Sequence, residues 1–329
     1  MLELLKKVLK PVAPSGLEEP VAAVIREEVA PYVDSIETDA LGNLICVKNG
    51  TEANPEKIML SAHMDHIGYI VTGIEKEGFL RVTNVGGISP TMSLTRHVSF
   101  PNGVQGVVVS EVSKDTAMKD LFVDIGAQDK ADAETMVRVG DVCVYANDCF
   151  QLGANRVASP AMDDRAACAL LIRFLQTVGA TKQTIIAVFS VQEEVGCRGA
   201  KGAAFQQEPD VGIVLEGTTC NDLGDVPETA HVCEAGHGVA VSFMDGASIA
   251  NRALFRKALD VAKQENIPHQ VKHSVSGGND GGAIQRAREG VPVVVLSVPC
   301  RYIHSPSSVV KLSDVESQFA LVKALVKAL

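Results

Sequence analysis

Several apolar runs in this 329-residue sequence end at side chains that can bind metal ions or move protons. Histidine nitrogens and carboxylate oxygens are ordinary protein ligands of divalent transition metals. Four runs (KIMLSA, TIIAVFSVQ, VGIVL and PVVVLSVPCRYI) lead into His63 and Asp65, Glu193 and Glu194, Glu216, and His304, and a further acid, Asp163, opens a predicted helix. Ligands gather outside the carboxyl ends of the strands in an open α/β sheet. We therefore expect these positions to converge at one edge of a sheet.

Two of these runs end at pairs of polar residues. His63 and Asp65 share a face of an extended segment, so Asp65 could orient His63 while the other ring nitrogen binds a metal. The alternative is an ordinary strand-end histidine beside a solvated aspartate. Glu193 and Glu194 are consecutive and must point in different directions, so one can ligate a metal while the other acts as general base on a metal-bound water. Two acids on a solvent-facing loop are the plainer interpretation.

The other three positions are ambiguous when each is taken singly. Asp163 stands at a predicted helix start, where a carboxylate is a good cap whether or not it also bridges two cations. Glu216 ends an apolar strand, and a buried glutamate is rare unless it is paired or bound to a metal. His304 lies in the irregular segment Tyr-Ile-His-Ser-Pro and could be a loop histidine without a partner. The prediction rests on the convergence of all the positions.

Two histidines and three to four carboxylates suit a pair of divalent ions, most plausibly Zn²⁺, Co²⁺ or Mn²⁺. Such a pair can clamp a bridging hydroxide and hydrolyse an amide or ester. The sequence contains no phosphate-binding G-x-x-x-x-G-K-[ST] loop, no G-x-G-x-x-G after a strand, no G-x-S-x-G and no H-E-x-x-H. Metal-assisted hydrolysis is therefore the only chemistry for which the sequence supplies a set of residues.

The elements that must position these residues alternate between helices and apolar strands, which predicts an α/β fold with a mostly parallel sheet. Ser15-Gly-Leu-Glu18 has capping-box spacing and predicts a helix start. Short alternating strands with tight turns fill the middle of the chain. We therefore expect a discontinuous catalytic domain, residues 1–66 and 156–329, with an inserted β-rich domain at residues 67–155.

Composition excludes several function classes. The chain is 46% hydrophobic and carries a net charge of −10, so it should form a large core and should bind neither nucleic acid nor an anionic membrane. Nothing resembles a membrane span or a signal peptide. The eight cysteines form no C-x-x-C pair, and several lie in apolar runs, which favours buried free thiols over a disulfide framework and predicts a cytoplasmic protein.

Five segments together resemble the glutamyl/tetrahedral aminopeptidases, a family of co-catalytic dinuclear metallo-aminopeptidases. They are SAHMDHIGYIV, PAMDDRAACALL, VFSVQEEVGCRGA, VLEGTT and RYIHSP, and the similarity extends over nearly the whole chain. The resemblance implies a zinc-peptidase-like α/β domain with an inserted β-barrel-like dimerisation domain. It also implies that dimers assemble into a tetrahedral dodecamer that trims peptides from their N-termini.

The resemblance also assigns roles to the residues. It implies that His63 and Glu216 hold one ion, that Glu194 and His304 hold the other, and that Asp163 bridges the two. Glu193 would be the general base, and Asp65 would orient His63. Many members have aspartate at the position of Glu216 and asparagine at the position of Asp164. The segment Gly277-Gly-Asn-Asp-Gly-Gly-Ala283 also departs from the commoner Gly-Thr-Asp-Ala form.

The resulting hypothesis is a cytoplasmic metal-dependent aminopeptidase with two divalent ions per chain and peptides as substrates. A deacylase or another amide hydrolase on the same dinuclear site is the first alternative. A non-catalytic assembly protein with this fold is the second. Replacing Glu193 by glutamine separates these classes, because a catalyst loses turnover while it keeps its metals, and a binding protein loses nothing.

Overall fold

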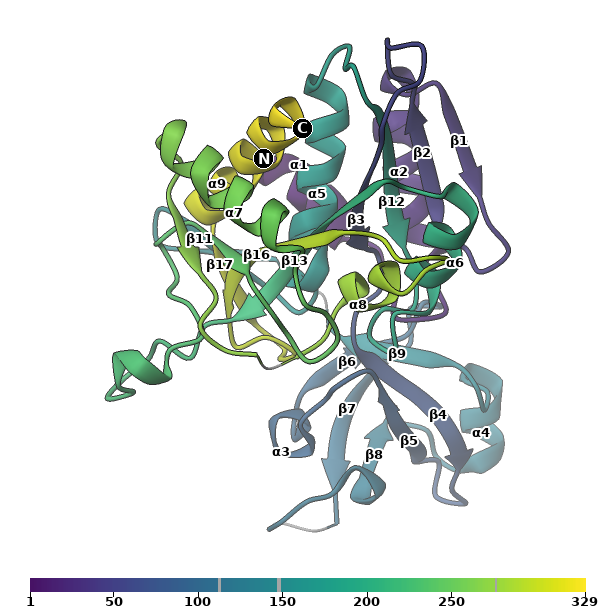
Figure 1. The fold of residues 1–329 in the computed structure, drawn as a ribbon. Coiled ribbons are helices and arrows are strands. Elements are labelled where there is room, and N and C mark those ends of the chain that lie inside the picture. Colours follow the sequence, from purple (N-terminus) through teal and green to yellow (C-terminus); the bar gives the residue numbers. More distant parts are fainter. Residues whose placement is uncertain (112–113, 147–148, 276) are drawn as a thin grey trace.

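A computed structural model describes residues 1–111, 114–146, 149–275 and 277–329 of the chain. These residues form a large mixed sheet with helices on both faces, and a separate closed β-barrel lies below it in Figure 1. Helix α1 (Leu2–Leu9) and helix α9 (Leu312–Ala328), which carry the two ends of the chain, lie together on the side of the large domain away from the barrel. The predicted α/β class is confirmed.

The large sheet contains eleven strands among the described residues. They are β1 (Ser35–Thr38), β2 (Leu44–Lys48), β3 (Lys57–His63), β10 (Phe150–Leu152), β11 (Arg156–Ser159), β12 (Thr184–Ser190), β13 (Val211–Thr219), β14 (Val239–Ser242), β15 (His269–Val271), β16 (Val293–Arg301) and β17 (Ser308–Lys311). Their order from one edge is β1-β2-β12-β3-β13-β16-β17-β11-β10, while β14 pairs with β16 and β15 with β14.

Parallel pairing is concentrated at the centre of this sheet. Strands β12, β3, β13 and β16 run parallel to one another, and most of the outer pairs, such as β1 with β2 and β16 with β17, are antiparallel. The central strands are apolar along almost their whole length because both faces of a parallel sheet are covered. The sheet is therefore more mixed than the predicted, mostly parallel one, and its parallel part is where the predicted site residues lie.

Helices cover the two faces of the sheet. One face packs against α1, α2 (Glu19–Val29), α5 (Met162–Thr177), α7 (Arg252–Gln264) and α9, and the other packs against α6 (Arg198–Gln207) and α8 (Asp280–Gln285). Successive strand residues alternate between the two cores: Ile58 and Leu60 lie in the first, and Met59 lies in the second. Two short 3₁₀ helices, η1 (Ala30–Tyr32) and η3 (Glu228–Ala230), complete this domain.

The barrel closes in the order β4-β5-β8-β7-β6-β9 and has its own apolar core. Its strands are β4 (Gly68–Ile74), β5 (Leu80–Val85), β6 (His97–Ser99), β7 (Gln105–Ser110), β8 (Leu121–Asp124) and β9 (Val142–Tyr145). Short helices α3 (Pro90–Ser93), η2 (Met118–Asp120) and α4 (Lys130–Met136) lie between strands. The Tyr69 and Tyr145 rings meet edge to face at 5.7 Å in this core. Strand β10, by contrast, pairs with β11 in the large sheet.

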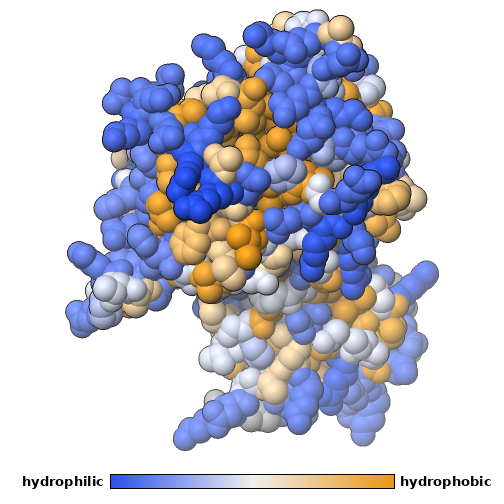
Figure 2. Space-filling view, in the orientation of Figure 1, coloured by the Kyte–Doolittle hydropathy of each residue, from blue (hydrophilic) through white to orange (hydrophobic). Residues whose placement is uncertain are grey.

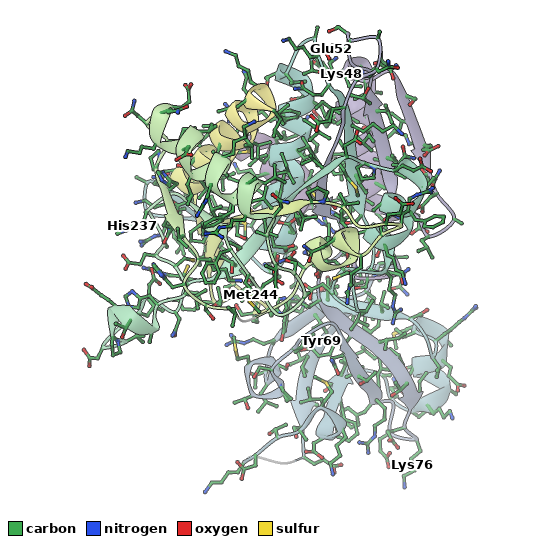
Figure 3. All side chains as sticks on the ribbon, viewed as in Figure 1. Lys48, Glu52, Tyr69, Lys76, His237 and Met244 are labelled. Carbon is green, nitrogen blue, oxygen red and sulfur yellow. The ribbon has the colours of Figure 1, made fainter. Side chains whose placement is uncertain are left out.

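Exposed apolar side chains gather after β14. Phe243, Met244 and Ile249 are 40%, 38% and 60% exposed. Met244 lies at the edge of the large domain nearest the barrel (Figure 3), and Figure 2 shows hydrophobic residues on this part of the surface. The same edge of the sheet carries the ends of the central parallel strands, where the polar residues predicted to form the site are found.

Candidate metal centre

Sheet register brings four predicted site residues together. His63 is the last residue of β3 and pairs with Ser190, the last residue of β12. Two residues, Val191 and Gln192, separate the end of β12 from Glu193 and Glu194. On the other side of β3, Ser61 pairs with Val214 of the parallel strand β13. Two residues later on each strand, His63 of β3 lies beside Glu216 of β13. The parallel pairing of three strands thus places an imidazole and three carboxylates at one edge.

The remaining two predicted metal ligands come from irregular backbone. Asp163 is the second residue of α5 but has φ −86° and ψ 108°, outside the helical region. His304 follows β16 with φ +58°, in the left-handed region that few residues other than glycine adopt. Local backbone conformations of this kind are held by their surroundings and concentrate at functional sites. Here they direct both side chains towards the ends of the central strands.

The side chains form two groups that share Asp163. His63 Nε2 lies 3.5 Å from Asp163 Oδ1 and 3.2 Å from Glu216 Oε1. His304 Nε2 lies 3.2 Å from Asp163 Oδ2 and 3.2 Å from Glu194 Oε2. In each group the three possible ligand atoms lie within 4.8 Å of one another. Asp163 therefore presents one carboxylate oxygen to each group, as a carboxylate between two cations would.

Several of these buried atoms have no hydrogen-bond partner. They are His63 Nε2, Asp163 Oδ1, Glu194 Oε1 and Glu216 Oε2. Buried polar atoms are almost always hydrogen-bonded, and buried carboxylates are costly unless they are paired or bound to a metal. The donor set, two imidazoles and three carboxylates, matches the chemistry of divalent transition metals. The residues at this edge of the sheet therefore fit a pair of such ions.

The electrostatics of the two imidazoles lead to the same conclusion. Burial by itself lowers the pKa of His304, but Asp163 and Glu194 outweigh it and raise the pKa to about 11. His63 is likewise buried, and Glu216 and Asp163 raise its pKa well above the usual value. Protons on the imidazoles thus balance the carboxylates when no cation is bound. Because metal ligands must be deprotonated, a divalent ion would take the place of these protons.

Glu193 lies beside the two groups. Its Oε2 is 3.9 Å from His63 Nε2, and burial raises its pKa to about 8. A carboxylate whose pKa lies near neutrality exchanges protons readily at neutral pH, as a general base must. Glu194, the next residue, points to His304 instead. The two consecutive glutamates do point in different directions.

Asp65 lies beneath the site. Its Oδ1 accepts a hydrogen bond from the main-chain N–H of Glu193, and its Oδ2 accepts bonds from the N–H of Glu194 and the hydroxyl of Ser15. The nearest acceptor for His63 Nδ1 is the main-chain oxygen of Asp65 at 3.0 Å, while the Asp65 carboxylate lies 3.6 Å away. Asp65 thus contacts His63 and also fixes the backbone that carries both glutamates.

Two further residues at this edge were not predicted from the sequence. Asp280 and Cys197 lie with Glu193 in a third group whose possible ligand atoms are within 4.8 Å of one another. Asp280 opens α8 and Cys197 precedes α6, so in the sequence an aspartate there indicates only a helix cap. No short motif signals that these two helix starts meet behind Glu193.

Comparison with known proteins agrees with this geometry. A sequence model of the M42 glutamyl aminopeptidase family matches residues 42–321. The chain belongs to the M42 glutamyl aminopeptidase family. It is therefore a hydrolase, a metal-dependent aminopeptidase, and the predicted resemblance is confirmed.

Relatives of this M42 protein match it over nearly their whole length. A putative aminopeptidase of Acetivibrio thermocellus is 39% identical over 335 residues, which cover 100% of this chain and 98% of the relative. An aminopeptidase of known structure from the archaeon Desulfurococcus kamchatkensis is 34% identical with a TM-score of 0.96, covering 99% of this chain and 94% of that one. The TET1 peptidase of Pyrococcus horikoshii, described as assembling into a tetrahedron or a large octahedral shell, is 32% identical with a TM-score of 0.88, covering 100% and 99%.

Two other findings concern the helices and the cysteines. Among the described residues of this M42 protein, no helix is long and apolar enough to cross a membrane. All eight cysteines are free, and six of them are buried.

Proposed function

We propose that this M42 aminopeptidase removes N-terminal residues from peptides by means of two divalent ions and a water that bridges them. The observation that carries the proposal is the pair of buried His–carboxylate groups sharing Asp163, with Glu193 beside them. A single-ion site would not need a carboxylate that presents one oxygen to each of two histidines.

The proposed ligands follow from the two groups. His63 and Glu216 hold one ion, Glu194 and His304 hold the other, and Asp163 bridges them. The set supports Zn²⁺, Co²⁺ or Mn²⁺, because imidazole together with carboxylate suits transition metals rather than Ca²⁺ or Mg²⁺.

When bound, the ions polarise the scissile carbonyl and lower the pKa of a bound water. Glu193 would take a proton from the attacking water through Oε2, the oxygen that faces the site, and pass it to the leaving amine. Asp65 keeps Glu193 in place by accepting the hydrogen bond of its main-chain N–H. Asp65 also contacts the ring nitrogen of His63 that faces away from the site, so it orients that ligand.

A release assay on a full panel of aminoacyl-p-nitroanilides tests this function. The protein is stripped with a chelator and reloaded with Zn²⁺, Co²⁺ or Mn²⁺, and the ions bound per chain are counted. The proposal is supported if the stripped protein regains release of N-terminal residues as it binds two ions per chain. If two ions bind and no substrate is cleaved, the proposed metal site stands, the proposed aminopeptidase activity is wrong, and the deacylase alternative takes its place.

We also propose that the chain self-associates into a dodecamer, with residues 67–155 as the dimerisation domain inserted into a catalytic domain of residues 1–66 and 156–329. The barrel strands, Gly68 to Tyr145, fall in that insert, and the shells formed by the Pyrococcus horikoshii relative support the assembly. Twelve copies of the 34.8 kDa chain weigh about 418 kDa. Light scattering tests this mass, and a monomer mass at every protein concentration would contradict it.

The free cysteines support the proposed cytoplasmic location, because disulfides are rare where thiols are kept reduced. Fractionation of the source cells, followed by immunoblotting against this chain, tests it.

A further inference from the structure

A thiol and a second carboxylate lie behind the proposed general base. Glu193 directs Oε2 towards His63 of the two-ion centre, and its other oxygen, Oε1, lies 3.3 Å from the sulfur of Cys197. A carboxylate oxygen of Asp280 completes this group, whose three possible ligand atoms lie within 4.8 Å of one another. Glu193 therefore stands between two sites and offers one oxygen to each.

The local fold holds Cys197 in this position. After Glu193 the backbone turns back on itself, so that the N–H groups of Gly196 and Cys197 both donate to the carbonyl of Glu193. Cys197 has φ +52° and directly precedes α6. Burial, together with the carboxylates of Glu193 and Asp280, raises the pKa of the Cys197 thiol, so it keeps its proton until a cation binds.

Asp280 is also fixed, with one oxygen left over. Its Oδ2 accepts hydrogen bonds from the hydroxyls of Ser190 and Ser61. Its Oδ1 is buried without a hydrogen-bond partner, and the residue is only 1% exposed. A buried carboxylate oxygen with no partner, next to a thiol and a second carboxylate, lacks a positively charged ligand.

We propose that Cys197, Glu193 and Asp280 form a third metal site, distinct from the two-ion centre, that binds a thiophilic divalent ion such as Zn²⁺ or Cd²⁺. Sulfur selects such ions over Mg²⁺, Ca²⁺ and Mn²⁺. Three protein ligands leave room for a water in a tetrahedral shell. On binding, the Cys197 thiol releases its proton to solvent, and the thiolate bonds to the ion.

This third site gives the enzyme a way to be inhibited by excess metal, an inference that rests on the proposed function. An ion on Oε1 of Glu193 withdraws charge from the carboxylate and fixes its position, so Oε2 no longer accepts the proton of the attacking water. Free Zn²⁺ above the amount that fills the two-ion centre should therefore lower turnover.

Cadmium titration tests the site without any reference to activity. None of the ligands proposed for the two-ion centre is a sulfur, so a thiolate-to-Cd²⁺ charge-transfer band in the ultraviolet reports only sites with cysteine. The protein is titrated with CdCl₂ as wild type, as Cys197→Ala and as Cys197→Ser, with Cys149→Ala as the control because Cys149 is a half-buried thiol outside all three groups. We expect both Cys197 variants to lose the part of the charge-transfer absorbance that corresponds to one Cd²⁺ per chain. The Cys149→Ala control should keep it. An undiminished band in Cys197→Ala overturns the site.

Inhibition by excess Zn²⁺ tests the consequence. Each variant is compared with its own rate at two ions per chain. Loss of a direct ligand should raise the inhibitory Zn²⁺ concentration of Cys197→Ala at least about 100-fold, because loss of an outer-shell partner alone costs 10–100-fold in metal affinity. Equal inhibition of wild type and Cys197→Ala overturns the proposed inhibition. If no form releases amino acids, the proposed function fails, and the cadmium band still decides whether the third site exists.

Discussion

In the proposed mechanism, Glu193 transfers a proton and does not bind an ion of the two-ion centre. Its Oε2 faces His63, but Glu193 belongs to neither of the two groups that share Asp163. We expect Glu193→Gln to keep two ions per chain and to lower kcat by about 10²–10⁴, the usual contribution of a general base. Metal content and the rate of aminoacyl release are measured on the same sample.

The neighbouring residue supplies the control for this substitution. Glu194 Oε2 lies 3.2 Å from His304 Nε2 in a group that can hold an ion, so Glu194→Gln should lose one ion together with activity. A Glu193→Gln protein that turns over at the wild-type rate would remove Glu193 from the mechanism.

His66 makes stability depend on pH. Its Nδ1 lies 2.9 Å from the carbonyl of Ile67, and its Nε2 is buried without a partner. Burial, helped by Arg165, lowers its pKa to about 3. In the unfolded chain the pKa returns to about 6.5. Between these values the unfolded state binds a proton that the folded state does not, so the free energy of unfolding falls as the pH drops below about 6.5.

Removing this imidazole should therefore flatten the acid side of the stability profile. We compare the metal-free wild type with metal-free His66→Asn as the pH is lowered from about 7.5 to about 5.5. The free energy of unfolding should decrease in both, and the decrease should be about 1.4 kcal/mol larger in the wild type. Urea unfolding at both pH values measures this difference. His269→Asn is the control, since His269 also lies beside a main-chain carbonyl but is only half-buried. Parallel profiles for wild type and His66→Asn would refute the assignment.

At the residue scale, sequence predicts the parts of the site that lie at strand ends. His63, Glu193, Glu194 and Glu216 all follow or end apolar runs, and parallel pairing brings such positions together whatever the side chains are. Asp280 was not predictable, because its packing against Ser61 and Ser190 depends on where α8 lies on the sheet.

Ser15 shows a second limit of sequence patterns. Its spacing to Glu18 indicates a capping box, but its hydroxyl donates to Asp65, and α2 begins at Glu19 without a side-chain cap. A tertiary hydrogen bond replaces the local one.

At the scale of elements, the loop after β5 joins the barrel to the metal centre. Gly86 has φ +78°, and a Cβ there would lie 2.8 Å from Ile67 Cγ2 and 3.1 Å from Glu194 Cβ. The next residue, Gly87, would place a Cβ 3.0 Å from His304 Nδ1. Backbone from the barrel therefore packs directly against two of the proposed metal ligands.

Substitution of these glycines separates backbone strain from contact with the site. Gly103, in the turn between β6 and β7, has φ +90° and nothing within 4 Å of its added Cβ. Gly86→Ala and Gly103→Ala should both pay about 1–2 kcal/mol for a left-handed alanine. Only Gly86→Ala should also displace Glu194, weakening metal binding and kcat/KM about tenfold or more. Equal kcat/KM in the two variants would show that this loop does not position the site.

The elements themselves were predicted best where periodicity is strong. The apolar run TIIAVFSVQ forms β12, and the helix predicted to open at Asp163 corresponds to α5, which begins one residue earlier. The antiparallel outer strands were not predictable, because an alternating or apolar run does not specify its partner. Partner choice follows from chain connections, such as the short link between β16 and β17.

At the scale of the whole molecule, the metal centre ties together segments that are distant in the sequence. Its proposed ligands come from the end of β3, the start of α5, the segment after β12, strand β13 and the segment after β16. Ions bound there join four central strands and one helix through direct bonds. An ion that binds the folded chain and not the unfolded one stabilises the fold by about 2.7 kcal/mol at a free concentration 100 times its Kd.

Stripping the ions should therefore lower the melting temperature of the entire large domain rather than soften the site alone. Without cations the buried carboxylates of Asp163, Glu194 and Glu216 keep unpartnered oxygens at the ends of the central strands, and each buried oxygen without a partner destabilises the folded state. We expect calorimetry to show that EDTA lowers the melting temperature by at least about 2 °C for each kcal/mol of binding energy removed. Zn²⁺ should restore the melting temperature. Mg²⁺ should not, because it dehydrates reluctantly and prefers oxygen ligands. His304→Ala, which lacks a ligand of one ion, should recover only part of the rise. Identical melting of stripped and reloaded protein would mean that the ions do not bind between these elements.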